Sequence, residues 1–357
     1  MRAQILYGIG NLVYAEMEAP TPKKGEALVK VEASGICGSD VPRIYKTGAH
    51  NMPLIPGHEF AGVVESCPDR PELLGKRVGV FPLIPCKECE PCKGRHYEMC
   101  KNYDYLGSRR DGGFAEYVPV PVWNLMLLPK EVTTEEAAML EPMSVAVHAM
   151  RRFKIGKKEN IVICGLGTIG LLLSWFLKDA GYKNLFFIGN KDVQKKMLTD
   201  MGFSIDRFCD VRYGDPVNFV MDKTGGKGAD TYFECIGRPE SYEQAVKCAS
   251  FLGKVVLVGN PTADMELTKD TYWKILRNQL QITGTWNSSY LGDEGDEKTD
   301  DWKYVIARLR AQKNKKTGDG FLPEKLITHR IRLVDLPYGL DIMKRKSEEY
   351  VKIMVKI

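Results

Sequence analysis

Hydrophobic positions follow two different patterns along the chain, and the pattern changes near residue 150. Before that point, short runs rich in β-branched residues are bounded by Gly, Pro and Lys, as in residues 27–33 and 77–81. Such runs are typical of strands in an irregular β domain. After that point, apolar runs alternate with helix-like segments of about ten residues, which predicts βαβ units and a parallel sheet. The fold class is therefore α/β, with a β-rich part first.

The alternating region predicts a series of short strands and helices. The expected strands are residues 160–164, 184–188, 230–234 and 253–258, and the expected helices are residues 168–179, 193–201 and 241–250. The last part of the chain predicts an acidic loop, a basic loop, a helix-like segment and a final strand, with the loops at 293–301 and 308–316 and the strand at 351–357. We divide the chain into a β-rich domain, a doubly wound dinucleotide-binding domain and a C-terminal portion, at residues 1–150, 151–289 and 290–357.

Composition is that of an ordinary globular protein. The chain has 357 residues, 44% hydrophobic and 27% charged, which is enough for two domains and excludes disordered classes. The net charge is only +5 and is not clustered, so we expect no nucleic-acid partner. Glycines interrupt the uncharged stretch 161–177, which predicts a buried strand, turn and helix and no membrane span. The N-terminus carries no signal-peptide pattern, so a cytoplasmic location is expected.

Four of the ten cysteines, Cys86, Cys89, Cys92 and Cys100, lie close together in the sequence. Gaps of two residues let successive thiolates turn back toward one point, and four soft sulfur ligands fit a tetrahedral zinc ion with no open position. An iron–sulfur cluster or two disulfides would use the same cysteines. The low overall density of cysteine does not fit a disulfide scaffold, so we predict a structural zinc site.

A second group of candidate ligands consists of Cys37, His58 and Glu59. One Cys, one His and one carboxylate are typical of a catalytic zinc site, which keeps a position for water or substrate. Glycines flank Cys37 and precede His58, and they give the backbone freedom to approach a metal. A single Cys or His is nevertheless more often a core residue, and spacing alone does not bring the two together. These residues by themselves leave open whether a second metal binds.

A glycine-rich turn follows the predicted strand 160–164 and begins the predicted helix 168–179. Gly165 supplies a tight turn, Gly167 lets the backbone approach a pyrophosphate, and Gly170 lets the helix pack on the strand. Because the motif has both a strand before it and a helix after it, we predict that this turn binds a dinucleotide. The predicted contacts are Gly165, Gly167, Thr168, Ile169 and Gly170.

The residue that contacts the adenosine ribose is expected about 20 positions after the glycine turn, at the end of the second strand. The sequence there is Gly189, Asn190 and Lys191, where an NAD site normally has Asp or Glu. No carboxylate is available to accept the 2′-hydroxyl bond or to repel a 2′-phosphate, and Lys191 offers a cation. Asn190 and Lys191 therefore favour NADP(H) over NAD(H), while Asp192 keeps NAD(H) as the alternative.

Arg109 and Arg110 precede a Gly-Gly turn at residues 112–113. Guanidinium groups bind phosphate or carboxylate oxygens in bidentate fashion, so this pair is a candidate for holding the charged end of a substrate. The alternative is that both side chains are solvated or form salt bridges.

With these motifs in place, the chain resembles the zinc-dependent medium-chain alcohol dehydrogenase family, and within it the polyol dehydrogenase branch. The resemblance runs almost end to end. Besides the four-cysteine segment and the dinucleotide turn, the motifs that carry it are residues 35–40 (Gly-Ile-Cys-Gly-Ser-Asp), 57–62 (Gly-His-Glu-Phe-Ala-Gly), 112–117 (Gly-Gly-Phe-Ala-Glu-Tyr) and 141–148 (Glu-Pro-Met-Ser-Val-Ala-Val-His). It implies a GroES-like β-rich catalytic domain, split in sequence around a Rossmann domain, so that residues 290–357 return to the catalytic domain.

The resemblance also implies roles for individual residues. It makes Cys37 and His58 ligands of a catalytic zinc ion, with Glu59 and Glu141 as carboxylates that alternate on the metal. It places the Ser39 hydroxyl in a proton relay. Catalytic residues are thus expected at Cys37, Ser39, His58, Glu59 and Glu141.

The activity that the resemblance implies is reversible oxidation of a secondary alcohol of a polyol to a ketone, with hydride transfer to NAD(P). The implied substrate is a polyol phosphate, such as galactitol 1-phosphate or ribitol 5-phosphate. An unphosphorylated polyol or an amino alcohol, of the sorbitol or threonine type, is the alternative, and a non-catalytic redox-sensing binding protein is a more distant one. We expect a homodimer or homotetramer with small-molecule partners, without nucleic acid or membrane.

Overall fold

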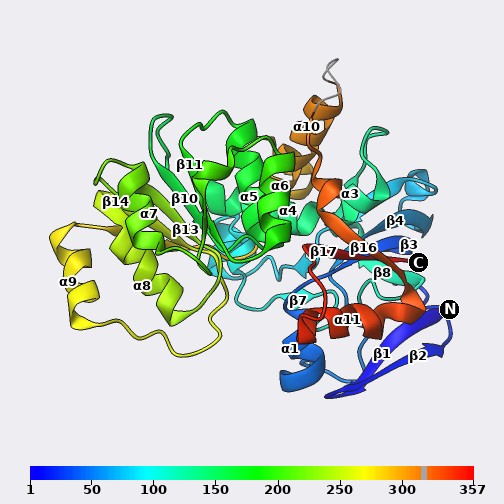
Figure 1. The fold of residues 1–357 in the computed structure, drawn as a ribbon. Helices are drawn as coiled ribbons and strands as arrows, with labels where there is room; N and C mark the ends of the chain where they lie inside the picture. Colours follow the sequence, from blue (N-terminus) through cyan, green and yellow to red (C-terminus); the bar gives the residue numbers. More distant parts are fainter. Residues whose placement is uncertain (315–319) are drawn as a thin grey trace. The chain divides into compact units, whose positions relative to one another are not determined.

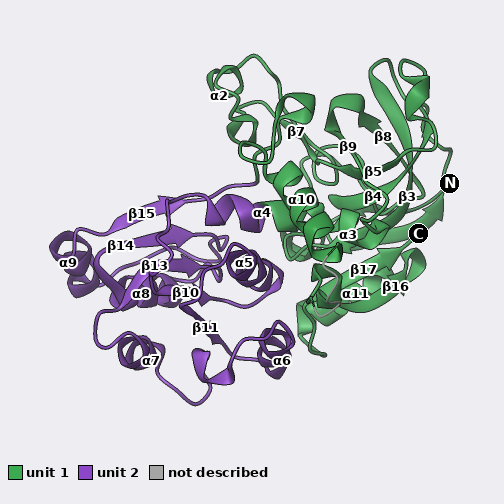
Figure 2. Cartoon of the chain, turned by 90° about the horizontal axis from the view of Figure 1, so that it is seen from above, with its two compact units in different colours: residues 1–144, 288–357 green, residues 145–287 purple. Residues whose placement is uncertain are grey.

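The chain folds into two units that are not continuous in sequence. The structure is a computed structural model, and it describes residues 1–314 and 320–357 (Figure 1). Unit 1 contains residues 1–144 and 288–357, and unit 2 contains residues 145–287 (Figure 2). Helix α4 (Leu140–Met150) spans the boundary between them.

Unit 2 is built on a parallel sheet of six strands in the order β12-β11-β10-β13-β14-β15. The strands are β10 (Ile161–Cys164), β11 (Leu185–Gly189), β12 (Phe208–Asp210), β13 (Ala229–Glu234), β14 (Ala249–Leu257) and β15 (Gln281–Gly284). Numbered from β10, this order is 3-2-1-4-5-6, which is the Rossmann arrangement. The order reverses between β10 and β13, so the carboxyl ends of the central strands face the place where such sheets bind dinucleotides.

Helices cover both faces of this sheet (Figure 2). They are α5 (Thr168–Asp179), α6 (Asp192–Asp200), α7 (Pro216–Lys223), α8 (Pro239–Cys248) and α9 (Lys269–Arg277). The strands β10 and β11 are buried along their whole length, as expected for a parallel sheet with two covered faces. Helix α5 is also buried from Gly170 to Leu177, which explains why its sequence is apolar almost throughout. The predicted stretch 161–177 is thus a core strand, a turn and a core helix.

Unit 1 contains a largely antiparallel sheet with the path β16-β17-β3-β4-β5-β9, and β8 also pairs with β3. The strands of unit 1 are β1 (Arg2–Gly8), β2 (Asn11–Glu16), β3 (Glu26–Ile36), β4 (Glu59–Ser66), β5 (Arg77–Val80), β6 (Leu83–Ile84), β7 (Asp104–Tyr105), β8 (Tyr117–Pro121), β9 (Leu125–Leu127), β16 (Ile327–Arg332) and β17 (Lys352–Lys356). Strands β1 and β2 form a separate two-stranded sheet, and so do β6 and β7. The helices of unit 1 are α1 (Asp40–Pro42), α2 (Glu90–Lys93), α3 (Thr134–Ala138), α10 (Asp301–Lys313) and α11 (Leu336–Arg345). Because β17 pairs with β3, the end of the chain completes the sheet that its beginning starts.

The acidic segment before residue 301 is a loop, as the sequence predicts, whereas the basic segment after it is largely helical. Asp300 is fully buried, and its carboxylate accepts the backbone N–H groups of Leu291 (2.7 Å) and Lys303 (3.0 Å). It therefore caps the first turn of α10, because helix N-termini leave unpaired N–H groups that an Asp side chain satisfies. The basic residues from Arg308 belong to this helix, and Lys315 and Lys316 lie outside the described residues.

An aromatic cluster holds the returning chain in unit 1. The ring of Tyr290 stacks on Phe81, with centroids 4.5 Å apart, and Trp302 meets Phe81 edge-on at 5.5 Å. The Tyr290 hydroxyl donates to the backbone oxygens of Trp123 and Leu125, both at 3.1 Å. Buried aromatic pairs with their polar atoms satisfied contribute strongly to packing.

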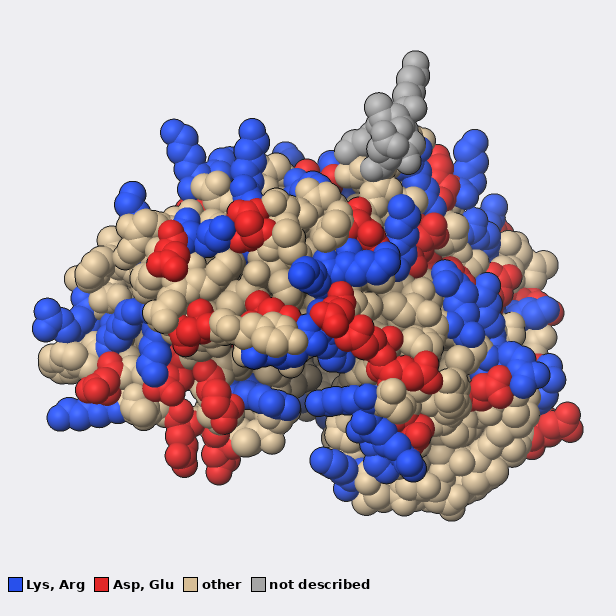
Figure 3. All heavy atoms as spheres, in the orientation of Figure 1, with Lys and Arg blue, Asp and Glu red and all other residues tan. Residues whose placement is uncertain are grey.

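The surface carries both signs of charge. On the face drawn in Figure 3, basic and acidic side chains are interspersed among the described residues. Within residues 1–314 and 320–357, every helix is too short or too polar to cross a bilayer.

Candidate functional site

Two neighbouring strands of unit 1, β3 and β4, bring Cys37, His58 and Glu59 to one place. Cys37 directly follows β3, and Glu59 is the first residue of β4, with His58 just before it. These two strands are antiparallel neighbours, and Gly35 pairs with Glu59 in the register. The end of β3 and the start of β4 therefore lie side by side. Residues that are far apart in sequence become neighbours because of strand pairing.

The ligand atoms of Cys37, His58 and Glu59 all lie within 4.8 Å of one another. His58 and Glu59 are buried, at 4% and 2% exposure, while Cys37 is half-buried. A thiolate, an imidazole and a carboxylate around one point match the ligand types of catalytic zinc, with a position left for another ligand. The donor set therefore fits zinc.

Glu141, at the start of α4, is the fourth predicted ligand. Glu141 does not belong to the group of Cys37, His58 and Glu59, but it is buried near that group. The hydroxyl of Tyr105 donates to Oε1 of Glu141 at 3.5 Å. Burial raises the pKa of Glu141 to about 7, and the neighbouring charges of His58 and Glu59 act in opposite directions on it. Ser39 is half-buried two residues after Cys37.

Asp40 lies beside both Cys37 and His58. It is fully buried, accepts the backbone N–H of Cys37 at 2.9 Å and pairs with Arg43 at 2.6 Å. Its Oδ1 lies 3.4 Å from Nδ1 of His58, which makes no hydrogen bond of good geometry. Burial alone would lower the pKa of His58, but the charges of Asp40 and Cys37 raise it well above the usual value. A carboxylate behind a histidine is the arrangement that orients an imidazole ligand toward a metal.

Lys352, the first residue of β17, forms a buried ion pair with Glu59. Its side chain is 2% exposed, and Nζ also donates to the backbone oxygen of Ile36 at 2.9 Å. A Cβ atom on Gly35 would lie 2.3 Å from Glu59 Oε2 and 2.7 Å from Lys352 Cε, so only glycine leaves room for the pair. Burial lowers the pKa of Lys352, but the Glu59 carboxylate more than offsets this and keeps the ammonium charged.

The four cysteines of the second predicted metal site also converge. Cys86, Cys89, Cys92 and Cys100 lie in the loop between β6 and β7, and their sulfur atoms are all within 4.8 Å of one another. Three of the sulfur–sulfur separations are 3.4, 3.9 and 4.0 Å. Four sulfurs at about 2.3 Å from a tetrahedral zinc ion would be about 3.8 Å apart, so the spacing fits zinc, whereas a disulfide needs about 2.05 Å.

Backbone N–H groups already stabilise negative charge in this four-cysteine site. The N–H groups of Lys101 and Cys92 point at the sulfur of Cys89 and lower its pKa to about 6. A thiol with a lowered pKa is present as thiolate at neutral pH, which is the form that binds metal. Lys87, in the same loop, lies 4.6 Å from the ring of Trp123.

The glycine turn of unit 2 has the geometry that its sequence predicts. Gly165 has φ of +92°, which favours glycine, and Gly167 has open space around its Cβ position. A Cβ on Gly170 would lie 2.0 Å from the Gly165 oxygen, so the helix can pack this closely only with glycine. Helix α5 begins at Thr168, and Ile169 lies in its first turn. Backbone N–H groups in the first turn of a helix suit a pyrophosphate.

Asn190 and Lys191 follow β11 and have their backbone N–H groups capped by one side chain. Both donate to Oε1 of Gln194, at 2.9 and 3.2 Å. The same oxygen lies 2.4 Å from where a Cβ on Gly189 would be. A side chain at residue 189 would therefore displace Gln194, which gives a physical reason for the glycine there.

The two arginines of the predicted substrate-phosphate site point to different partners. Arg110 pairs with Glu26 at 2.6 Å and with Asp104 at 3.6 Å, so its charge is balanced inside the protein. Arg109 lies over the ring of Tyr103, with 4.5 Å to the centroid, and its Nε is buried without a hydrogen-bond partner. Both residues nevertheless line one surface pocket, together with Asn51 and Asp111.

Sequence reasoning missed Lys352, Asp40 and Tyr105. Asp40 belongs to a motif that the sequence displays, but nothing in the motif assigns it a contact. Lys352 carries a clearer signal, because it is a lysine in the otherwise apolar run Val351–Val355 of a predicted strand. A charged residue at a buried strand position needs a partner, and that requirement points to a functional or structural carboxylate.

Two family models match this chain. Residues 23–130 match the alcohol dehydrogenase GroES-like domain, and residues 168–310 match zinc-binding dehydrogenase. Galactitol 1-phosphate 5-dehydrogenase of Escherichia coli (strain K12) is 36% identical over 281 residues, which cover 78% of this chain and 80% of that protein.

Solved structures agree with these matches. The crystal structure of galactitol-1-phosphate dehydrogenase from Escherichia coli has a TM-score of 0.89 and 30% identity, and covers both chains completely. A zinc-binding dehydrogenase from Sinorhizobium meliloti 1021 bound to NADP has a TM-score of 0.86 and 26% identity over 100% of this chain and 99% of that one. An alcohol dehydrogenase (rspB) from E. coli CFT073 complexed with NADH has a TM-score of 0.87 and 25% identity, with the same coverage.

The buried ion pair leads to a stability prediction. Lys352→Met leaves the Glu59 carboxylate buried without its cation, so we expect the free energy of unfolding to fall by about 3–5 kcal/mol. Lys356→Met is the matched control on the same strand. Lys356 is 56% exposed and pairs with Glu135, so its loss is expected to cost less than about 1 kcal/mol. Urea denaturation of both variants measures their free energies of unfolding. Equal losses in the two variants would contradict a stabilising role for the buried pair of Glu59 and Lys352.

Proposed function

Because the chain belongs to the zinc-binding alcohol dehydrogenase family, we propose that it oxidises a secondary alcohol of a polyol to a ketone, reversibly, with hydride transfer to a nicotinamide dinucleotide. The observation that carries this proposal is the convergence of Cys37, His58 and Glu59 at the paired ends of β3 and β4. A sulfur, a nitrogen and an oxygen ligand, two of them buried, match the ligand types of a catalytic zinc site, which keeps one position open.

The residues of unit 1 have distinct tasks in this proposal. Cys37, His58 and Glu59 hold the catalytic zinc ion, with Glu141 as the second carboxylate within reach. Zinc, when bound, supplies the positive charge that makes a substrate hydroxyl easier to deprotonate. The hydroxyl of Ser39 takes the proton and passes it outward. Asp40 holds the imidazole of His58, and Lys352 holds the carboxylate of Glu59.

The other two motifs support the reaction without taking part in proton transfer. Cys86, Cys89, Cys92 and Cys100 hold a structural zinc ion that fixes the loop between β6 and β7. In unit 2, Gly165, Gly167, Thr168, Ile169 and Gly170 hold the dinucleotide pyrophosphate at the start of α5. The rate enhancement then comes from orientation of cofactor and substrate together with the charge at the metal.

NADP(H) is the proposed cofactor in preference to NAD(H). Residue 189 is glycine and offers no carboxylate to the ribose hydroxyls, and the Oε1 atom of Gln194 lies where a side chain at residue 189 would begin. Lys191 supplies a cation beside Asn190 at the end of β11. Relatives bound to NADP and to NADH are both known, so the choice depends on these local residues.

A polyol phosphate, such as galactitol 1-phosphate, is the proposed substrate. The support is the 36% identity to galactitol 1-phosphate 5-dehydrogenase. Of the two candidate arginines, Arg109 is the better one for the phosphate, because Arg110 is already paired with Glu26 and Asp104. An unphosphorylated polyol or an amino alcohol would need neither arginine.

We propose that the protein works as a homodimer or homotetramer. Strand β15 is last in its sheet and is partly exposed, so one of its edges presents unpaired backbone groups. Phe251, Trp273 and Leu276 of the same unit expose 77%, 55% and 51% of their surface. Large exposed apolar side chains of this kind mark association surfaces.

Substrate and cofactor are tested together by initial rates. The zinc-supplied protein is assayed with galactitol 1-phosphate, ribitol 5-phosphate, sorbitol and threonine, each with NADP and with NAD. We expect the highest kcat/KM for a polyol phosphate with NADP. We also expect Arg109→Ala to lower kcat/KM for phosphorylated substrates and to leave it unchanged for the others. Turnover of sorbitol or threonine alone would show that the phosphate assignment is wrong.

The four-cysteine site leads to a prediction about stability and metal content. Cys89→Ser removes a ligand whose thiolate the backbone already stabilises, so we expect one zinc ion fewer per chain and a lower Tm. The folded fraction is expected to keep its kcat, because these residues do not touch substrate. Cys209→Ser is the control, since Cys209 is buried in unit 2 away from both clusters. Unchanged zinc content and Tm in Cys89→Ser would contradict the site.

A further inference from the structure

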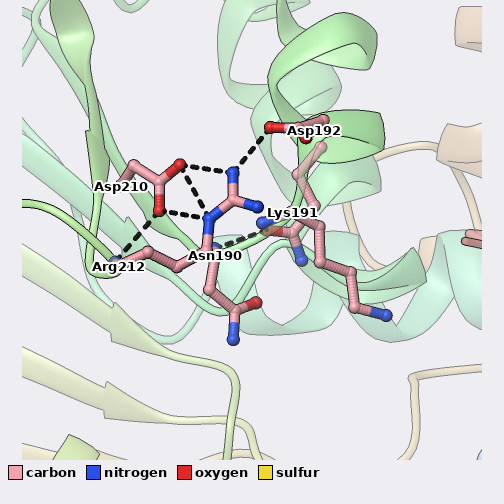
Figure 4. A network of polar contacts seen from close by, with 6 residues as sticks. Asn190, Lys191, Asp192, Asp210 and Arg212 are labelled. Carbon is pink, nitrogen blue, oxygen red and sulfur yellow. Dashed lines mark hydrogen bonds and ion pairs between the residues drawn. The ribbon is translucent and has the colours of Figure 1, made fainter.

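Arg212 lies at the place where the parallel sheet of unit 2 receives the adenosine end of a dinucleotide. Strands β11 and β12 run parallel, and Gly189 pairs with Asp210 in their register. Arg212 comes two residues after β12 ends. The carboxyl ends of β11 and β12 are therefore adjacent, and the arginine belongs to the same sheet edge as Asn190 and Lys191 (Figure 4).

Two carboxylates hold the Arg212 guanidinium in a fixed orientation. Its Nε donates to both Asp210 oxygens, at 2.9 and 3.1 Å, and its Nη2 donates to Asp210 Oδ2 at 2.6 Å. The same Nη2 donates to Asp192 Oδ1 at 2.6 Å, and the backbone N–H of Arg212 donates to Asp210 Oδ1 at 3.0 Å. The dashed lines in Figure 4 show this network. A bidentate arginine with a second carboxylate on its edge has little freedom to turn.

One end of the guanidinium remains available. An arginine has five N–H donors, and the contacts above use Nε and Nη2. Nη1 has no hydrogen bond or ion pair with any residue that the structure describes, and 36% of the side chain is exposed. The two N–H groups of Nη1 are therefore free to bind a ligand.

Stability alone gives a poor reason for this network. Asp192 is 75% exposed, so its ion pair with Arg212 adds little to stability, and Asp210, which is 17% exposed, already binds the guanidinium through both oxygens. The network instead links the loop after β11, which contains Asp192, to the loop after β12, which contains Asp210. Its effect is to fix Arg212 beside the ribose position.

The local charge suits an anion. Lys191, Lys195 and Arg212 carry three positive charges, and Asp192 and Asp210 carry two negative ones, which leaves one positive charge. Residue 189 contributes no carboxylate, because it is glycine, and a Cβ atom there would lie 2.4 Å from Gln194 Oε1. Asp210 is a poor acceptor for a ribose hydroxyl, since both its oxygens are already bonded to Arg212.

We propose that Arg212 is a specificity-determining residue that donates Nη1–H bonds to the adenosine 2′-phosphate of NADP(H), with Asp210 and Asp192 as positioning residues. This inference rests on the NADP(H) preference proposed above and adds a residue to it. Lys191 provides a point charge, whereas Arg212 provides a fixed fork, and a fork matches the geometry of phosphate oxygens.

The test measures binding of two nucleotides that differ only in the 2′-phosphate. Isothermal titration calorimetry gives Kd values of adenosine 2′,5′-bisphosphate and of 5′-AMP for the full-length protein. For Arg212→Met we expect the Kd of the bisphosphate to rise about tenfold or more, and the Kd of 5′-AMP to change less than about twofold. Arg212→Lys keeps the charge without the fork and is expected to lie between wild type and Arg212→Met.

Arg207→Met is the matched control. Arg207 precedes β12, at the end of the strand opposite to Arg212, and donates to the backbone oxygen of Lys183. We expect it to change neither Kd. If Arg212→Met does not fold, the Kd values of Arg212→Lys test the inference. A site that needs the guanidinium fork must then bind adenosine 2′,5′-bisphosphate more weakly while its Kd for 5′-AMP is unchanged.

The outcomes separate this inference from the proposed cofactor preference. If the wild-type protein binds 5′-AMP as tightly as the bisphosphate, the NADP(H) preference fails, and the inference fails with it. If the wild-type protein prefers the bisphosphate and Arg212→Met retains that preference, only the inference fails, and Lys191 carries the selectivity. Equal weakening of both nucleotides would make Arg212 a structural link between two loops and would also overturn the inference.

Discussion

The buried pair of Glu59 and Lys352 is the constraint on which the candidate active site depends. A carboxylate at 2% exposure is costly unless a cation lies beside it, and the cation comes from the last strand of the chain. Ligands from β3 and β4 can therefore stay buried only when β17 has joined the sheet. Pairing of β17 with β3 therefore brings Lys352 to Glu59 and stabilises the buried carboxylate.

The two units meet different requirements of the reaction. Unit 1 combines charges of both signs in a small buried volume, and its tightest contacts, such as Gly35 against Glu59, admit no larger residue. Unit 2 presents backbone N–H groups and glycines at the carboxyl ends of parallel strands, where a nucleotide binds. The first unit provides chemical reactivity, and the second provides recognition of a large cofactor. Separate hydrophobic cores allow each to be optimised by itself.

Much of this was predictable from sequence, and the rest depends on long-range contacts. The expected helix over residues 168–179 is α5 to the residue, because a glycine turn and a charged end bound an apolar segment. The GroES-like and Rossmann fold class is also confirmed. The short strands β12 and β15 were not predicted, since their few residues carry no clear alternation. Lys352 lies 293 residues from Glu59, and no local pattern connects two such positions.

The central claim is that the group of Cys37, His58 and Glu59 holds a metal needed for hydride transfer. Zinc content and NADPH formation measured on the same samples of wild type and Cys37→Ser test it most directly. We predict two zinc ions per chain in the wild type. For Cys37→Ser we predict one zinc ion per chain, unchanged cofactor binding and no turnover. A Cys37→Ser protein with two zinc ions and full turnover would contradict it.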